Sequence, residues 1–430
     1  DGRKGNKLVV FGSIPDSWIS LNGNIWNILQ PELRFSSDSL SIHGFSLVNG
    51  NQSISVDGAL SNRFDKRLTV RARDFDLSSF AGFMKKNFGI RGTIEADLVI
   101  GTHKDANTDI QGTIFCPELM VGKHSAGSLE LRAEMDPEDF EMLNFSLRNS
   151  TASSPDAIRI SGGSFNLASN VVRAKASFNN FDLSFAEAFV EDYCSDLRGK
   201  LNGSINISGN VSNEQFIQKG IRCDALMLKE GHALLKPTGV AYDLDGKLKY
   251  QQGELSLENM TLRDSNSGIA VLSGNLDELL LNLENFKVLD KRNDGSPFYG
   301  HLAVGGNMRL AGLADGNLNL GGTIATAGAG DVSIITAFNA NSESVLLNFT
   351  QPVDSSMTSE ALTVLPKKKE SSSLKMDCRF VVSPQVKLTA FLDKAASNVI
   401  SASGDGDITI GFDSSQGDIR LGGDYVINEG

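Results

Sequence analysis

Apolar and polar residues alternate along most of the chain. The alternation is plainest in four stretches, at residues 93–100, 201–207, 307–310 and 386–392. Successive side chains of a β-strand point to opposite faces, so each stretch predicts a strand with one apolar and one polar face. Antiparallel sheets with one face in water have this pattern, whereas strands buried in a parallel sheet are apolar on both faces. We therefore expect an all-β fold built from many short antiparallel strands.

The apolar members of these strands are expected to share one inward face. Alternation alone is compatible with a closed solenoid core and with an open trough, and by itself it favours the closed core. The residues expected on the inward face are Ile94, Leu98, Ile100, Leu201, Ile205, Ile207, Met308, Leu310, Leu318, Leu320, Leu388, Leu392, Ile408, Ile410, Ile419 and Leu421.

Two short segments, 78–88 and 184–193, replace the alternation with apolar residues at helical spacing. In the second segment, Ser184 and Glu187 have the spacing of a capping box, in which each side chain accepts a hydrogen bond from the other's backbone N–H. We expect two short helices that pack on the sheet through their phenylalanines. The alternative is contact with a lipid or a partner.

The helical segments belong to an internal repeat. Each follows a Phe-Asp-Leu-Ser sequence, at Phe75 and Phe181, and each precedes an Arg-Gly pair at the start of the next strand. A weaker third copy begins at Phe286 and has a polar loop, 291–297, in place of the helix. Self-similarity at a fixed period is typical of elongated repeat proteins. The sequence thus predicts β-repeat segments at 1–74, 75–180, 181–285 and 286–430, with a disordered loop or insertion at 353–373.

Composition supports a protein rich in strands and turns. The 430 residues include 43 Gly but only 10 Pro, and the glycines fall with Asn, Asp and Ser between the apolar stretches. The net charge of −12 disfavours nucleic-acid binding, which requires clustered Lys and Arg. The densest basic run, at 367–369, is expected to be a solvated loop.

A search for chemical sites finds no catalytic, metal or cofactor motif. The five histidines are isolated in the sequence, and no phosphate-binding or nucleophile motif is present. A catalytic site made of two carboxylates that only folding brings together stays open as an alternative. The cysteines, Cys116, Cys194, Cys223 and Cys378, are far apart, so we expect free thiols, with one long-range disulfide as the alternative. The sequence predicts a protein that is not an enzyme and has no cofactor.

No apolar run approaches the roughly 18 to 20 residues of a membrane span, and no signal peptide is recognisable. The chain begins at Asp1 without Met and stops within a strand-like pattern. We expect an excised segment whose membrane anchor lies elsewhere.

The C-terminal third has the most specific pattern. The sequence ISASGDGDITI at 400–410 is followed by GDIRLGGDYVINEG at 417–430, and FYGHLAVGG occupies 298–306. These strands resemble the C-terminal region of the TamB/AsmA-like family, which has G-x-G-x-L-x-L and G-x-Y-x-I-x-x-G strands. The Phe-Asp-Leu-Ser units resemble the repeats of that family. One departure is that the aromatic-rich strands that normally follow in the family do not follow here.

The resemblance implies a periplasmic segment of a protein anchored in the inner membrane of a Gram-negative bacterium. Such proteins are linked to outer-membrane biogenesis and phospholipid transport, with an outer-membrane barrel of the TamA or BamA type as partner. It implies a sheet curled into a taco-like groove, and this favours the open trough over the closed core.

Two other functions stay open. The same fold would serve as a scaffold or chaperone for the assembly of outer-membrane β-barrel proteins such as autotransporters, through strand pairing at its edges. A secreted β-helix adhesin or polysaccharide-acting enzyme is the second alternative.

Overall fold

The structure of the chain is a computed structural model. It describes residues 9–21, 24–29, 31–78, 89–103, 108–191, 193–292, 298–312, 317–335, 373–391, 399–413 and 418–430. Strands make up almost all of these residues, and the helical elements have three to five residues each. The prediction of an all-β fold is confirmed. The chain divides into two compact units, which are residues 1–237 with 241–260, and residues 238–240 with 261–430.

Unit 1 contains most of the strands and the helical elements. Its strands are β1 (Val9–Ser13), β2 (Ser17–Leu21), β3 (Asn24–Leu29), β4 (Glu32–Ser36), β5 (Ser39–Asn49), β6 (Gln52–Ser61), β7 (Lys66–Asp76), β8 (Ile90–Arg91), β9 (Thr93–Thr102), β10 (Thr108–Val121), β11 (His124–Met135), β12 (Met142–Ser150), β13 (Ile158–Asn166), β14 (Val171–Asp182), β15 (Cys194–Asn210) and β16 (Ile221–Leu235). The 3-10 helix η2 (Ser184–Ala186) and α1 (Glu187–Val190) precede β15, and α2 (Phe216–Gly220) follows it. The strands β17 (Val240–Gln251) and β18 (Glu254–Arg263) contain the boundary between the units.

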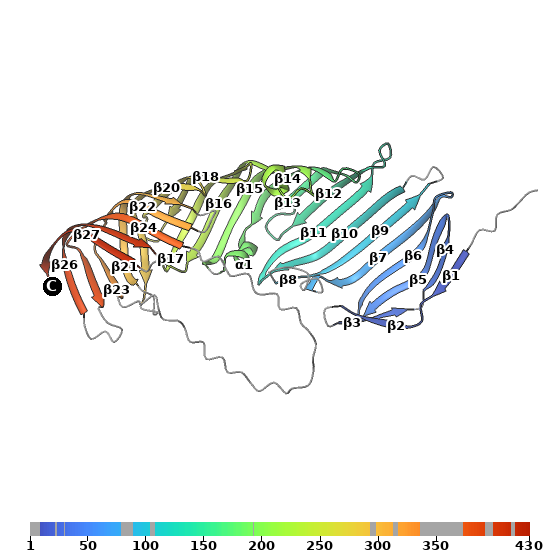
Figure 1. Ribbon diagram of the computed structural model, residues 1–430, viewed down its shortest axis with the longest axis horizontal. Helices are drawn as coiled ribbons and strands as arrows, with labels where there is room; N and C mark the ends of the chain where they lie inside the picture. The colour runs from blue at the N-terminus through green and yellow to red at the C-terminus, as the bar shows by residue number, and fades with distance from the viewer. Residues whose placement is uncertain are drawn as a thin grey trace, which may run out of the picture. The chain divides into compact units, whose positions relative to one another are not determined.

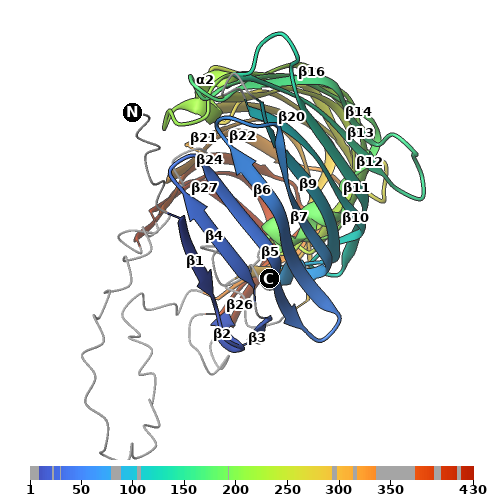
Figure 2. The ribbon, with the colours of Figure 1, turned by 90° about the vertical axis from the view of Figure 1, so that its right-hand side faces the viewer.

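The strands of unit 1 pair almost in chain order. From β5 to β16 each long strand is antiparallel to the next, so the chain runs back and forth as a meander. Figure 1 shows these strands side by side, and Figure 2 shows that they bend into one curved layer. At the N-terminal end, β5 pairs with β4 along its first half and with β3 along its second half. The result is a sheet in which neighbours in sequence are neighbours in space.

Unit 2 contains the remaining strands. They are β19 (Ile269–Asn275), β20 (Glu278–Lys291), β21 (Phe298–Ala311), β22 (Asn317–Thr326), β23 (Gly330–Ile335), β24 (Ser373–Val382), β25 (Val386–Phe391), β26 (Val399–Asp413) and β27 (Asp418–Glu429). The pairs β19–β20, β20–β21 and β26–β27 are antiparallel.

Between β21 and β26 the pairings of unit 2 close into a ring of six strands. β22 and β23 pair with successive parts of β21, and β24 and β25 pair with successive parts of β26. The pairs β22–β24 and β23–β25 are parallel, which differs from the expected antiparallel arrangement. Parallel neighbours require the chain to return to the same end of the sheet, and the interval between β23 and β24 has the length to do so.

The internal repeat of the sequence is also a repeat of backbone geometry. Asp74, Asn180 and Asn285 have φ values of 50°, 49° and 47°, and the strand register shifts at each of these points. The phenylalanine that follows each of them is buried, with 6–7% of its surface exposed. Asp and Asn tolerate the left-handed conformation better than other non-glycine residues. Each repeat therefore places a β-bulge and a buried phenylalanine at the same position.

The Arg-Gly pairs of the repeat complete this bulge. Gly92 and Gly199 have φ values of 145° and 151°, and their carbonyls accept hydrogen bonds of 2.9 Å from the N–H groups of Leu77 and Leu183. A Cβ on Gly92 would lie 2.6 Å from the carbonyl oxygen of Glu118. Glycine is thus required at this position, where the backbone passes close to β10. The division into four repeat segments that the sequence predicts is not tested by the division of the structure into two units.

The expected helix at 184–193 is shorter than predicted, because η2 and α1 together end at Val190. The prediction of a capping box at Ser184 and Glu187 was wrong. Neither helical element has a side-chain cap, and the Glu187 carboxylate instead accepts a hydrogen bond from the distant N–H of Leu197. The Ser184 N–H donates to Asp182. Residues 79–88 of the other expected helix and the loop 353–372 lie outside the described residues.

Candidate apolar binding face

One row of paired residues in unit 1 is apolar in every strand it crosses. Residues paired directly across a sheet have their side chains on the same face, so pairing can be followed from strand to strand. The apolar row consists of Ile28, Leu47, Ile54, Ala72, Ala96, Ile114, Leu131, Leu147, Ile160, Ala176 and Ile205. It crosses eleven strands without a polar side chain.

The next row along the same strands faces the other way and is polar. This polar row consists of Ser55, Arg71, Asp97, Thr113, Arg132 and Ser146. Arg71 lies 3.4 Å from Asp97, which also pairs with Arg73 at 2.7 Å. The polar face is therefore hydrated and carries ion pairs, whereas the apolar row has no group to donate or accept a hydrogen bond.

Much of the apolar row is only partly shielded from solvent. Ile114 is 39% exposed, and Ile54, Leu131, Leu147 and Ile205 are half-buried. In a two-layer fold the facing layer would bury such residues almost completely. Ile160 and Ala176 are the row's buried members, at 9% and 6% exposure. Unit 1 thus presents a single sheet with an accessible apolar face.

Unit 2 has the same separation of faces. Its rows contain only apolar residues and glycine from β19 to β27. The first row is Leu272, Leu281, Met308, Gly322, Cys378, Ile410 and Leu421, and the second is Gly274, Leu279, Leu310, Leu320, Met376, Phe412 and Ile419. A third runs through Ala270, Leu283, Gly306, Ile324, Phe380, Ile408 and Gly423.

The residues expected to face inward can be placed on these rows. Ile94, Leu98, Ile100, Leu201, Ile205 and Ile207 each pair with an apolar residue or glycine in unit 1. In unit 2, Met308, Leu310, Leu320, Ile408, Ile410, Ile419 and Leu421 lie on the three rows, Leu318 pairs with Leu374, and Leu388 pairs with Val332 and Ala402. Leu392 lies outside the described residues. That these residues bind a ligand stays a prediction.

Sequence reasoning missed much of the same face. Ala72, Ala96, Ile114, Leu131 and Leu147 belong to the apolar row but were not among the expected residues. The signal was present, since residues 127–135 and 142–147 also alternate. Small residues such as Ala72 and Ala96 give this signal weakly, because alanine occurs on both faces of strands.

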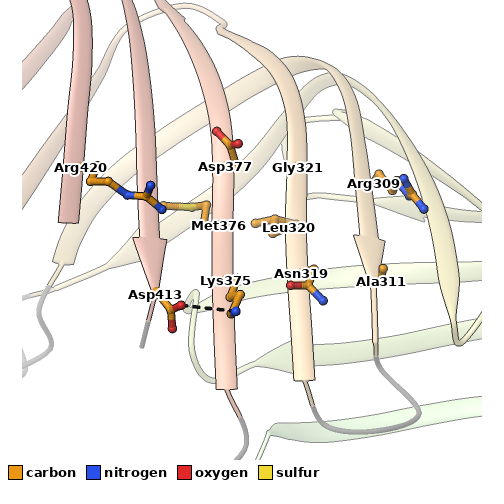
Figure 3. A pocket seen from close by; sticks show the side chains of 10 residues that line it. All are labelled: Arg309, Ala311, Asn319, Leu320, Gly321, Lys375, Met376, Asp377, Asp413 and Arg420. Atoms are coloured by element: carbon orange, nitrogen blue, oxygen red, sulfur yellow. Dashed lines mark ion pairs between the residues drawn. The ribbon is translucent and has the colours of Figure 1, made fainter. Parts of the chain in front are cut away.

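A pocket of about 510 Å³ lies in unit 2 on β21, β22, β24, β26 and β27 (Figure 3). Arg309, Lys375 and Arg420 line it together with Asp377 and Asp413, and Gly321 leaves space between them. The charges pair with neighbours, because Lys375 lies 3.5 Å from Asp413 and Arg309 lies 2.7 Å from Glu278. Two of the charges that line the pocket are thus neutralised by separate ion pairs, and Leu320 and Met376 of the second apolar row also line it. The apolar rows remain the stronger candidate site.

In the described part of the chain, histidines lie beside carboxylates and the cysteines are free thiols. Histidines isolated in the sequence meet carboxylates from neighbouring strands, as in His232 with Asp243 at 2.7 Å and His301 with Asp290 at 3.0 Å. Within that part, no three His, Cys, Asp or Glu residues are grouped to hold a metal ion. All four cysteines are free and buried, and burial raises the pKa of the Cys378 thiol.

No helix among the described residues is long and apolar enough to cross a membrane. Models of known families, curated proteins and solved structures were compared with the chain, and none of them matches it.

Proposed function

We propose that the chain is a periplasmic segment of a TamB/AsmA-like protein that carries phospholipid acyl chains along its apolar face between the inner and outer membranes. The observation that carries the proposal is the apolar row of unit 1, which is uninterrupted from Ile28 to Ile205 yet partly open to solvent. Head groups would stay in water at the edge of the sheet while the acyl chains lie on the row. The activity would support outer-membrane biogenesis.

Energetics favour an acyl chain as the occupant. Each CH₂ group moved from a bilayer into water costs about 0.8 kcal/mol, which amounts to on the order of 10 kcal/mol for a whole chain. An apolar surface that continues from strand to strand removes most of this cost at every position. Movement along it requires no chemical step.

The apolar row fits an acyl chain better than an extended polypeptide. A polypeptide strand lying on this face would leave its backbone N–H and C=O groups without partners, because the row offers no hydrogen-bonding side chain. An acyl chain has no such groups. The alternative in which the protein guides outer-membrane β-barrel proteins would instead use the edge strands, where backbone groups are available.

Photo-crosslinking tests the proposal on paired positions. The photoreactive residue p-benzoylphenylalanine is placed at Leu131 or Leu147 of the apolar row. The matched controls carry it at Arg132 or Ser146, which pair with each other on the opposite face. The protein is purified from cells with a Gram-negative envelope, illuminated and analysed by mass spectrometry for attached phospholipid.

We expect phospholipid adducts at Leu131 and Leu147 and at least tenfold fewer at Arg132 and Ser146. Equal labelling on the two faces, or no adduct at either apolar position, would overturn the proposal. Adducts to an outer-membrane protein at an edge strand, without lipid on the row, would support the assembly scaffold instead.

A further inference from the structure

A short segment lies against the apolar face of unit 1 and connects strands that are far apart in the sheet. This segment, residues 183–191, includes η2 and α1, and we call it the strap. It contacts β10, β11 and β15, although β12, β13 and β14 separate β11 from β15 in the order of pairing. Figure 1 shows α1 at the ends of the strands. The sheet therefore curls at this end until β11 and β15 meet at the strap.

Glu187 makes the connection. Its carboxylate lies 2.7 Å from Nζ of Lys123 in the β10–β11 turn, and it also accepts a hydrogen bond of 3.1 Å from the N–H of Leu197 in β15. His124 lies 3.6 Å from the same carboxylate. A single buried side chain, 7% exposed, thus links two strands that are four positions apart in the sheet.

Apolar contacts hold the strap on the face. The Phe185 ring lies 5.3 Å from that of Phe181, which is the buried phenylalanine of the second repeat and pairs with Leu201. A Cβ on Gly122 would lie 3.3 Å from the Cβ of Ala188, so the β10–β11 turn approaches α1 closely. The strap covers Phe181 on the apolar face, while Leu201, the cross-strand partner of Phe181, is half-buried.

Burial differs between the part of the sheet near the strap and the apolar row. Asn149, Ser154 and Ala157, which lie at the ends of β12 and β13 between β11 and β15, are at most 3% exposed. Leu131 of β11 and Leu147 of β12 lie further from the strap along their strands, and both are half-buried. Unit 1 thus has one closed region and one open region on the same face.

The closed region carries features that lower the cost of opening it. His124 Nε2, which lies 3.6 Å from the Glu187 carboxylate, is buried without a hydrogen-bond partner, and such an atom costs about 1–3 kcal/mol. The strap has no side-chain cap, and helices this short are not stable by themselves in water. Lys123, on the other side of the ion pair, is 71% exposed. Water can therefore satisfy these groups when the strap lifts.

We propose that the strap is a gate on the apolar face, with the Lys123–Glu187 ion pair as its latch. When the latch is closed, the strap covers the face at Phe181, next to Leu201. When it opens, this part of the face becomes available to acyl chains and the accessible face widens. The inference rests on the proposed function, because the gate has a role only if lipid occupies the apolar row.

A reversible crosslink tests the gate. In the double variant Gly122→Cys/Ala188→Cys the Cβ separation is within a few tenths of an ångström of that of a disulfide, so oxidation would hold the strap closed. Peptide mass mapping verifies the bond, and the native thiols are buried. The photoreactive residue is placed at Leu201, near the strap, or at Leu131, on the open row. Lipid labelling is compared before and after reduction.

We expect oxidation to reduce labelling at Leu201 at least fivefold, reduction to restore it, and labelling at Leu131 to stay unchanged. Equal labelling at Leu201 in both states would overturn the gate. An absence of lipid at Leu131 in every state would instead remove the proposed function on which the gate rests.

A second variant avoids the strain of a cysteine at Gly122, whose φ is 60°. Glu187→Gln keeps an acceptor for Leu197 but removes the charge that holds Lys123. We expect labelling at Leu201 to rise at least twofold over the native protein. Unchanged or lower labelling at Leu201 in a folded Glu187→Gln protein would contradict the latch.

Discussion

The two faces of unit 1 differ although they are built from the same strands. The apolar row and the polar row are one residue apart along each strand, yet one has only Ile, Leu and Ala and the other has Ser, Thr, Asp and Arg. The polar face is stabilised in water by its hydration and ion pairs. The apolar face is partly open, and exposed apolar surface of this extent usually marks a binding site. The proposed function requires this difference, because only an accessible apolar face can take an acyl chain.

Of the changes that test the difference between the two faces, a charge on the apolar row should have the largest effect on phospholipid transfer. Ile205→Asp places a carboxylate where Ala176 is the cross-strand neighbour, and an unpaired charge on an apolar surface costs several kcal/mol when an acyl chain covers it. We expect passage of fluorescent phospholipid between vesicles to fall by more than about a hundredfold.

The matched control for this variant is Asn206→Asp, one residue further and on the polar face. Its neighbours Lys175 and Arg222 are basic, so the new charge is accommodated. Native transfer by the Ile205→Asp protein, with its fold intact, would remove the apolar row from the transport path.

Removal of the buried phenylalanine of the repeat should have the next largest effect, which is a loss of stability. Phe181→Ala deletes a side chain that is 7% exposed, whereas Phe115→Ala deletes one on the polar face that is 44% exposed. We expect the free energy of unfolding to fall by about 3–5 kcal/mol for Phe181→Ala and by less than about 1 kcal/mol for Phe115→Ala. Urea unfolding followed by circular dichroism measures both. Similar losses for the two variants would show that the faces do not differ in packing.

Much of this two-faced fold was predictable from the sequence. Period-two alternation at Ile94 to Ile100 and at Leu201 to Ile207 specified strands, because only an extended chain places every second residue on one face. The repeat of Phe75 and Phe181 was visible as a motif. Its geometric cause, a bulge at Asp74 and Asn180, was not, since a positive φ at Asp or Asn leaves no pattern of its own.

The closed region near the strap could not be predicted, because its contacts join residues that are distant in sequence. The spacing of Ser184 and Glu187 matched a capping box, but Lys123 and Leu197 provide stronger partners for the Glu187 carboxylate. Local helix rules do not include such partners. For the same reason the parallel pairs β22–β24 and β23–β25 left no sequence signal.

The Glu187 latch should have a moderate and pH-dependent effect. The hydrogen bond from Lys123 and that from the Leu197 N–H hold the pKa of Glu187 below its usual value, against the opposing effect of burial. A lowered pKa contributes stability that is complete above the ordinary pKa of glutamate and is lost as the pH falls through the lowered value. His124, Cys194, Glu191, Asp196 and Lys236 are the other titratable groups around the latch.

We expect Glu187→Gln to lower the free energy of unfolding by about 1 kcal/mol at neutral pH. The difference from the native protein should shrink as the pH falls through the lowered pKa of Glu187 and vanish once the native carboxylate is protonated as well. Parallel urea titrations of the two proteins over a series of pH values from neutral to acid isolate this group, since all other carboxylates are shared. A difference that persists or grows in acid would show that Glu187 does not act as a charged latch.

The smallest effect is expected on the polar row. Arg132 pairs with Glu130 on the same strand, and its side chain is 67% exposed. Exposed ion pairs contribute little, because the charges are screened by solvent and the long side chains lose conformational freedom. We expect Arg132→Ala to change the free energy of unfolding by less than about 0.5 kcal/mol and to leave phospholipid transfer within about twofold of the native rate. Leu131, its neighbour in sequence, faces the apolar row, so a large loss of transfer in Arg132→Ala would place the lipid on the polar face and reverse the roles of the two faces.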